Sequence, residues 1–190
     1  MSAASENVSR RSVIYLGQEA YKMEDLETDP AGKPHAFDTI VFGGLAIGVL
    51  DFLDASIFFP KYFGITVQRV WQSVAAGVLG REAAIAGGWN TAILGMFLHF
   101  VVAFCIATVY YFLSRNISFL IRQPIISGLV YGVAAHFVMQ YVVIPLSAIG
   151  WRASTFDLVS FLNSFIGHAL LVGLPVALIA AWSEKRNSLS

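Results

Sequence analysis

Four long apolar stretches without lysine, arginine or glutamate constrain this chain more than any other feature of its sequence. They cover Thr39–Phe59, Trp89–Leu113, Pro124–Ile149 and Leu158–Trp182, with lengths of 21, 25, 26 and 25 residues. A helix needs roughly 20 apolar residues to cross the hydrocarbon core of a bilayer, so each stretch is long enough to span it. Lipid offers no partner to bare backbone groups, and the alternating strands of a barrel are absent, so the spans are predicted to be helical. We therefore predict an all-α membrane protein with four transmembrane helices in a bundle.

Composition excludes the other broad classes. The chain has 190 residues, of which 57% are hydrophobic and 13% charged, against about 25% charged residues in ordinary soluble domains. A soluble globular fold could not bury that much apolar surface, and a disordered chain would carry far less of it. The single cysteine excludes a disulfide scaffold. A formal net charge of zero gives no basic surface for nucleic acid, so we predict no nucleic-acid partner.

The apolar region is flanked by two polar segments. Residues 1–38 hold four of the twelve Lys and Arg and seven of the twelve Asp and Glu, which predicts a polar, acidic N-terminal tail. Residues 39–182 form the predicted transmembrane domain, and residues 183–190 a C-terminal tail. Four spans place both tails on the same side of the membrane. Five Lys and Arg lie near the membrane on that side and four on the other, which favours a cytoplasmic location for both termini.

The segment between the first two spans has the pattern of an amphipathic helix. From Thr66 to Gly80, apolar side chains recur at helical spacing, and polar side chains occupy the opposite face. The apolar positions are Val67, Val70, Trp71, Val74 and Val78, and the polar ones are Gln68, Arg69, Gln72 and Ser73. We predict an interfacial helix over 66–80. It would act either as a plain spacer, or as a lid over the bundle or docking surface for a partner.

Each predicted span carries an ionisable side chain. The first contains Asp51 and Asp54, and the next three contain His99, His136 and His168. At about 1.5 Å per residue, Asp51 and the three histidines fall within roughly 3 Å of one another in depth, with Asp54 about one turn further out. Such groups are costly in lipid and rarely face it. We therefore expect them to face the interior of the bundle.

The neighbouring residues support an inward orientation. Small residues mark the faces on which membrane helices pack, and Asp51 and the three histidines each continue a small or polar stripe at helical spacing. The stripes are Gly44–Gly48–Asp51, Gly95–His99–Ala103, Gly128–Gly132–His136–Gln140 and Ser160–Ser164–His168. The prediction is one buried cluster of Asp51, His99, His136 and His168, with Asp54, Gln140 and Asn163 as polar neighbours.

Three roles remain open for this cluster. Imidazoles on facing helices, with a carboxylate, are suitable ligands for haem or a transition metal, and a metal site at His99, His136, His168 and Asp51 is the function we predict. An intramembrane chain of Asp and His is also typical of a proton or ion pathway. Alternatively, the cluster is a structural hydrogen-bonded contact in an accessory subunit of a larger membrane complex. No GxSxG, P-loop, CxxC or dinucleotide motif occurs, so we predict no enzymatic activity.

Three segments carry a resemblance to a known family. The segments "LHFVVAF" around His99, "GLVYGVAAHFVMQYVVIPLS" around His136 and "FIGHALL" around His168 resemble the YagU-like bacterial inner-membrane proteins. The resemblance covers roughly residues 40–182. It implies a multi-pass protein of the bacterial cytoplasmic membrane, with the lipid bilayer as its environment, and supplies no cofactor or substrate. The paired aspartates of "LDFLDASIFFP" depart from the family pattern, so it implies no role for Asp51 and Asp54. A bundle of only four spans also suggests a homo-oligomer or a larger complex.

Overall fold

The computed structural model describes residues 34–150 and 157–187. The predicted N-terminal tail lies almost entirely outside the described residues, and so does the end of the predicted C-terminal tail.

Four helical spans form the framework, as the sequence predicts. They cover Asp38–Phe63, Gly88–Asn116, Pro124–Leu146 and Leu158–Arg186, and no strand occurs within residues 34–150 and 157–187. Each span begins within one residue of its predicted start. The all-α membrane fold is therefore confirmed.

Three of the four spans are composite. The elements of the spans are η1 (Asp38–Phe42) and α2 (Gly43–Phe63) in the first, α5 (Gly88–Asn116) alone in the second, α7 (Pro124–Val138), η2 (Met139–Val143) and α8 (Ile144–Leu146) in the third, and α9 (Leu158–Gly167), η3 (His168–Gly173) and α10 (Leu174–Asn187) in the fourth. The elements named η are π-helical. Shorter helices connect the spans: α3 (Val67–Leu79), α4 (Arg81–Ala86) and α6 (Phe119–Arg122).

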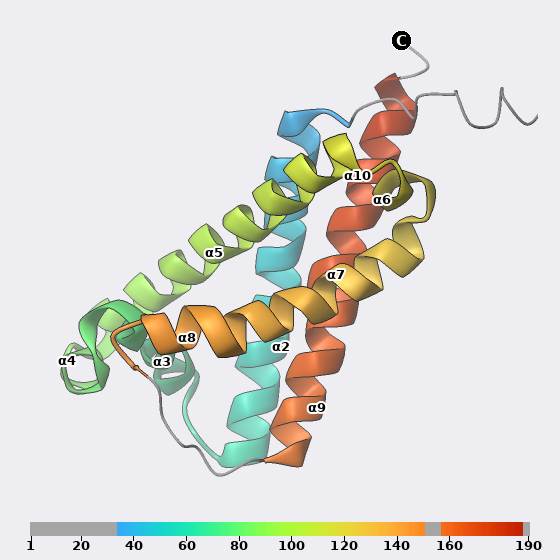
Figure 1. Cartoon of the computed structure of the whole chain (residues 1–190). Helices are drawn as coiled ribbons and strands as arrows, with labels where there is room; N and C mark the ends of the chain where they lie inside the picture. The colour runs from blue at the N-terminus through green and yellow to red at the C-terminus, as the bar shows by residue number, and fades with distance from the viewer. Residues whose placement is uncertain (1–33, 151–156, 188–190) are drawn as a thin grey trace, which may run out of the picture. The chain divides into compact units, whose positions relative to one another are not determined.

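The first and fourth spans run side by side in opposite directions, with α5 packed against α2 and α7 packed against η3 and α10 (Figure 1). One end of the bundle carries the start of the first span and the end of the fourth, and we call it the Asp38 end. The opposite end carries α3, α4 and the start of α9 at Asp157, and we call it the Asp157 end. Successive spans alternate between these two ends, as a four-span membrane topology requires.

Glycines allow the backbones of α7 and η3 to come into direct contact. A Cβ atom added to Gly132 would lie 2.1 Å from the carbonyl oxygen of His168, and one added to Gly173 would lie 2.0 Å from that of Gly128. Only glycine fits at these positions. The predicted small-residue stripe of the third span therefore marks a true helix contact, and this contact sets the position of His168 beside α7.

An apolar core fills the Asp38 half of the bundle, and polar contacts close its end. The buried side chains of this core are Ile47, Ala103, Ala107, Tyr110, Ile121, Val172, Val176, Ala177 and Ala180. At the end itself, Arg186 Nη2 lies 2.5 Å from Asp38 Oδ2, and the hydroxyl of Ser183 donates to the same carboxylate at 3.1 Å. The Ser183 oxygen also accepts from the backbone N–H of His35 at 2.9 Å. These contacts join the first and fourth spans where the described chain begins and ends.

Helix α3 forms where the sequence predicts the interfacial helix, and its buried side takes residues from both predicted faces. Val70 and Trp71 of the predicted apolar face are 5% and 1% exposed and Gln72 of the predicted polar face is 5% exposed, whereas Val78 of the apolar face is 63% exposed. Gln72 is buried because its amide donates to the carbonyls of Ile85 and Gly88, at 3.2 and 2.9 Å, and so binds the α4–α5 junction. The expectation of Gln72 on an exposed polar face is wrong, because these carbonyls offer the amide buried partners.

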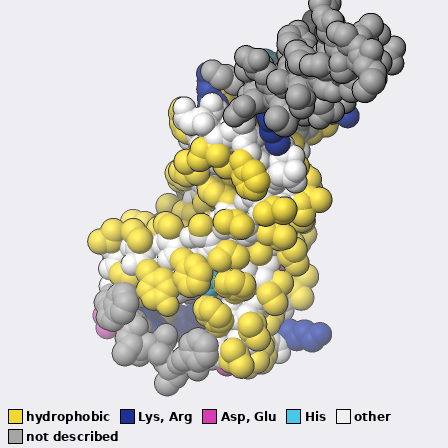
Figure 2. Space-filling model, turned by 45° about the vertical axis from the view of Figure 1, so that its right-hand side comes forward, with side chains coloured by type: hydrophobic (Ala, Val, Ile, Leu, Met, Phe, Trp, Pro, Cys, Tyr) yellow, Lys and Arg dark blue, Asp and Glu magenta, His cyan; other side chains and the backbone are white. Residues whose placement is uncertain are grey.

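The exterior between the two ends is apolar. Figure 2 shows hydrophobic side chains covering this part of the face it presents, with lysine and arginine mainly toward the ends. Many large apolar side chains along the spans are exposed, among them Val49, Phe97, Val130 and Ile166. In water such a surface would drive aggregation, whereas in lipid it is solvated. The surface agrees with a membrane environment.

Candidate functional site: a polar cavity in the bundle

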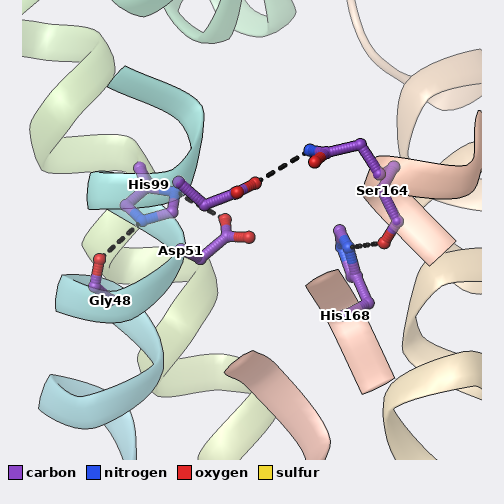
Figure 3. A network of polar contacts seen from close by, with 7 residues as sticks. Gly48, Asp51, His99, Ser164 and His168 are labelled. Carbon is purple, nitrogen blue, oxygen red and sulfur yellow. Dashed lines mark hydrogen bonds and ion pairs between the residues drawn. The ribbon is translucent and has the colours of Figure 1, made fainter. Parts of the chain in front are cut away.

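Asp51 of α2 and His99 of α5 face each other inside the bundle. His99 Nδ1 lies 3.8 Å from Asp51 Oδ2, and the side chains of His99 and Asp51 are 13% and 24% exposed. The other ring nitrogen, Nε2, lies 3.0 Å from the carbonyl oxygen of Gly48, one turn before Asp51. Figure 3 shows the ring held between this carbonyl and the carboxylate.

The hydrogen bond to Gly48 determines what the Asp51–His99 pair can do. A carbonyl oxygen only accepts hydrogen bonds, so His99 Nε2 must carry its hydrogen. In neutral His99, Nδ1 is then a bare lone pair, and it faces a carboxylate that also only accepts. One proton placed on either group removes this repulsion and leaves the pair with no net charge. The geometry therefore creates a place for one proton.

Aromatic residues enclose His99. Phe52 stacks on Trp71 with ring centroids 4.3 Å apart, and the Trp71 ring lies 5.2 Å from the His99 ring, at 63° to it. Because Trp71 belongs to α3, this helix covers one side of the Asp51–His99 pair.

His136 and His168 form a second pair, from α7 and η3. Their ring centroids are 5.3 Å apart, and both bind Ser164: His168 Nδ1 donates to the Ser164 carbonyl at 2.8 Å (Figure 3), and His136 Nδ1 lies 3.2 Å from the Ser164 hydroxyl. His136 is 1% exposed, and its Nε2 has no hydrogen-bond partner among the described residues. The rings of Phe137, Phe161 and Phe165 surround it at 5.5 to 5.9 Å.

A cavity of about 50 Å³ lies between the Asp51–His99 pair and His168 of the second pair. Its lining includes three of the four residues that the sequence predicts to meet, namely Asp51, His99 and His168. The apolar part of the lining is Ile47, Val102, Ala103, Ile106, Met139 and Val172. One water needs roughly 10–15 Å³ of such volume and two or more polar partners, so this cavity has room for water between Asp51, His99 and His168. His136 lies behind His168 and is not part of the lining.

Two π-helical segments shape this cavity, and proline explains both. Three residues of the cavity lining belong to these segments: Met139 is the first residue of η2, and His168 and Val172 belong to η3. Pro145 and Pro175 each follow the end of a π-segment by two residues. A proline has no N–H and its ring clashes with the carbonyl four residues earlier, which here lies inside the π-segment in both cases. The wider π-turn relieves this conflict, and π-turns are frequent at functional sites.

The predicted polar neighbours have different outcomes. Asn163 Nδ2 donates to Asp54 Oδ2 at 2.9 Å, which joins α9 to α2 close to the cavity. Gln140, in contrast, is exposed on η2. The spacing that places Gln140 with His136 assumes a continuous α-helix, and the π-segment that begins at Met139 changes the rotation of the residues after it. The expectation for Gln140 is therefore wrong.

The predicted four-ligand metal site is not assembled. Across residues 34–150 and 157–187, no three His, Cys, Asp or Glu side chains lie close enough together to hold a metal ion. The two pairs lie on opposite sides of the cavity, and His136 is separated from it by His168. This arrangement does not support metal or haem ligation by Asp51, His99, His136 and His168 together.

Four membrane-spanning helices around a cavity lined by one aspartate and two histidines define the class: the chain is an integral, multi-pass membrane protein with a polar site between its helices. No family model, curated protein or solved structure matches it.

Proposed function

We propose that this protein binds protons at the Asp51–His99 pair and transfers them through the cavity. The observation that carries the proposal is the bond from His99 Nε2 to the Gly48 carbonyl, because it turns the lone pair of Nδ1 toward Asp51. The pair then holds one proton between two acceptors. Asp and His chains inside membranes are typical of proton pathways.

The second histidine pair supplies the next acceptor. His168 Nδ1 is the donor to Ser164, so Nε2 of neutral His168 has a free lone pair. A proton released from His99 Nδ1 to a water in the cavity can pass to this nitrogen, and the pair it leaves regains one negative charge. Binding of the next proton removes that charge and returns the pair to its starting state.

Proton transfer accounts for the geometry better than a metal site does. A proton needs only the pair at 3.8 Å and a chain of acceptors, whereas a metal needs three or four converging ligands. Metal or haem binding remains a distinct outcome of the test below, as does a purely structural role in a larger complex.

The proposal includes the location that the sequence favours. We place the chain in the bacterial cytoplasmic membrane with both termini in the cytoplasm, as a member of the YagU-like proteins. Support comes from the excess of lysine and arginine on the terminal side and from the three histidine-containing segments.

The test is proton flux into liposomes that contain the purified protein, driven by a potassium diffusion potential and followed with a pH-sensitive dye. We expect flux above that of empty liposomes, and its loss in Asp51→Asn, which cannot accept a proton. Glu82→Gln is the matched control, because it makes the same carboxylate-to-amide change at an exposed position of α4 and should leave flux unchanged.

Two results would contradict the proposal. One is flux no greater than that of empty liposomes from protein that is folded by circular dichroism; the other is normal flux in Asp51→Asn. Elemental analysis and an absorption spectrum of the same preparation identify the metal alternative: stoichiometric metal or a haem band, lost in His99→Ala, would replace the proton role by a cofactor role.

A further inference from the structure

Polar side chains continue from the cavity toward the Asp157 end, between α2 and α9. The Asn163–Asp54 hydrogen bond lies next to the cavity, and at the ends of the same two helices the Tyr62 hydroxyl donates to Asp157 Oδ1 at 3.3 Å. Tyr62 follows Asp51 by eleven residues, and Asp157 precedes His168 by eleven. At 1.5 Å per residue this is roughly 16 Å, about half of a ~30 Å hydrocarbon core.

One buried hydroxyl lies along the same stretch. Ser160 Oγ on α9, one turn before Asn163, is inaccessible and has no hydrogen-bond partner among the described residues. We use the name polar track for five residues of α2 and of the start of α9: Asp54, Tyr62, Asp157, Ser160 and Asn163.

The other half of the bundle has the opposite character. From the cavity to the Asp38 end, the interior is the apolar core around Ala107, Val176 and Ala180, each 0% exposed. The tyrosine hydroxyls on this side are bonded to carbonyls: Tyr131 donates to Ile106 at 2.6 Å and Tyr110 to Leu120 at 3.0 Å. Neither hydroxyl has its proton free to extend a chain of hydrogen bonds toward the Asp38 end.

We infer that in this conformation the cavity exchanges protons with one side of the membrane only, the side of the Asp157 end, through the polar track. The inference rests on the proposed proton role and specifies its access. A hydronium ion at the Asp157 end gives its proton to the track and leaves as water, and the proton reaches the Asp51–His99 pair past Asp54. The carboxylates of Asp157 and Asp54 attract cations along this path.

The apolar core then acts as a seal. A charged species that crosses this mainly apolar core, over about half of a bilayer, meets a high barrier. Complete transfer across the membrane therefore requires the helices around the core to separate, and turnover has the kinetics of a carrier rather than those of an open pore.

Cysteine labelling from one side of a vesicle tests the access. Cys105, which is exposed, is first replaced in a Cys105→Ser background. Two exposed positions then mark the two ends: Glu82→Cys in α4 for the Asp157 end, and Ser118→Cys in the α5–α6 turn for the Asp38 end. Each protein is reconstituted in the same lipid and exposed to a membrane-impermeant, positively charged thiol reagent added outside, in vesicles where the two markers label to different extents.

The track residue Ser160→Cys should label more slowly than the Glu82→Cys marker, because its side chain is buried. Its final labelled fraction should equal that of Glu82→Cys, because the reagent reaches both from the same side. Val176→Cys, inside the apolar core, should not label from either side. Asn163→Cys provides a second track position, one turn further along α9, in case Ser160→Cys does not fold. Labelling of both track positions in step with Ser118→Cys, or at the unreactive level of Val176→Cys, would overturn the inference.

The labelling result is independent of proton flux. If the track positions label but the protein shows no proton flux, the access route is supported and the proton role is contradicted. If the protein shows flux but the track positions do not label, the proton role is supported and the access route is contradicted.

Discussion

The Asp51–His99 pair and the His136–His168 pair lie at similar predicted depth in the membrane but differ in chemistry. The Asp51–His99 pair contains a carboxylate, has a backbone acceptor on its other side and is partly exposed, so two acceptors face each other with room for one proton between them. The His136–His168 pair contains no acid, and His136 is enclosed by phenylalanine rings. The difference shows that the chemical role of a buried histidine depends on the groups that its ring faces and not on its depth in the membrane.

The largest expected effect concerns the cover of the first pair. Trp71→Ala removes a fully buried indole that stacks on Phe52 and contacts His99, and should lower the free energy of unfolding by about 3–5 kcal/mol. Denaturant unfolding in mild detergent measures it. Trp89→Ala, at a site 58% exposed, is the matched control and should change stability little. Equal losses in both variants would refute a specific cover over the Asp51–His99 pair.

The second pair depends instead on backbone contact. Gly132→Ala places a methyl 2.1 Å from the His168 carbonyl, which forces α7 away from η3 and should destabilise the protein by up to about 3 kcal/mol. Gly77→Ala, where the nearest atom is 3.8 Å away, should instead stabilise α3 by about 0.5–1 kcal/mol. In Gly132→Ala the imidazole NMR signals of His136 and His168 should shift more than those of His99, and the reverse pattern would contradict this account.

Replacing each pair's histidine by phenylalanine compares the pairs directly. His99→Phe leaves Asp51 without its partner and should cost about 1–3 kcal/mol of stability. His136→Phe removes a buried nitrogen without a partner, but it also removes the hydrogen bond between Nδ1 and the Ser164 hydroxyl, so it should cost less, about 0.5–1.5 kcal/mol. Unfolding of both variants under the same conditions measures the difference. A cost for His136→Phe as large as that for His99→Phe would show that the carboxylate of Asp51 adds nothing to how His99 is held.

The smallest effect concerns a carboxylate outside both pairs. The side-chain and backbone hydrogen bonds between Asp157 and Ser160, together with that from Tyr62, hold the pKa of Asp157 below its ordinary value. The native state therefore favours ionised Asp157, and the stability this contributes is present above the ordinary pKa near 3.8 and is lost as pH falls through the lower native value. Asp157→Asn keeps an N-cap acceptor but does not titrate. Thermal unfolding at neutral and acid pH should show a small acid-induced loss in the native protein that is reduced in Asp157→Asn; an equal loss in both would contradict it.

The amino-acid sequence predicts the four spans and part of the candidate site correctly. Continuous apolar length predicts where the helices begin, and counting residues from span midpoints places Asp51, His99 and His168 at the level where they line one cavity. Depth alone does not give radial order, so it could not show that His136 lies behind His168. The exposure of Gln140 depends on the π-segment η2, which the hydrophobic pattern does not reveal, although Pro145 two residues after it is a signal. The buried face of α3 depends on carbonyls of α4 and α5 that only tertiary structure brings to Gln72.

The ion pair between Asp38 and Arg186 has a consequence for engineering the chain. Because the first span begins where the fourth one finishes, a short linker from Arg186 to His35 would close the polypeptide into a ring with little strain. New ends opened in the exposed turn at Ser118 would give a circular permutant with the same number of membrane crossings. Such a permutant would place reporter proteins at the α5–α6 turn and leave the junction of the first and fourth spans intact.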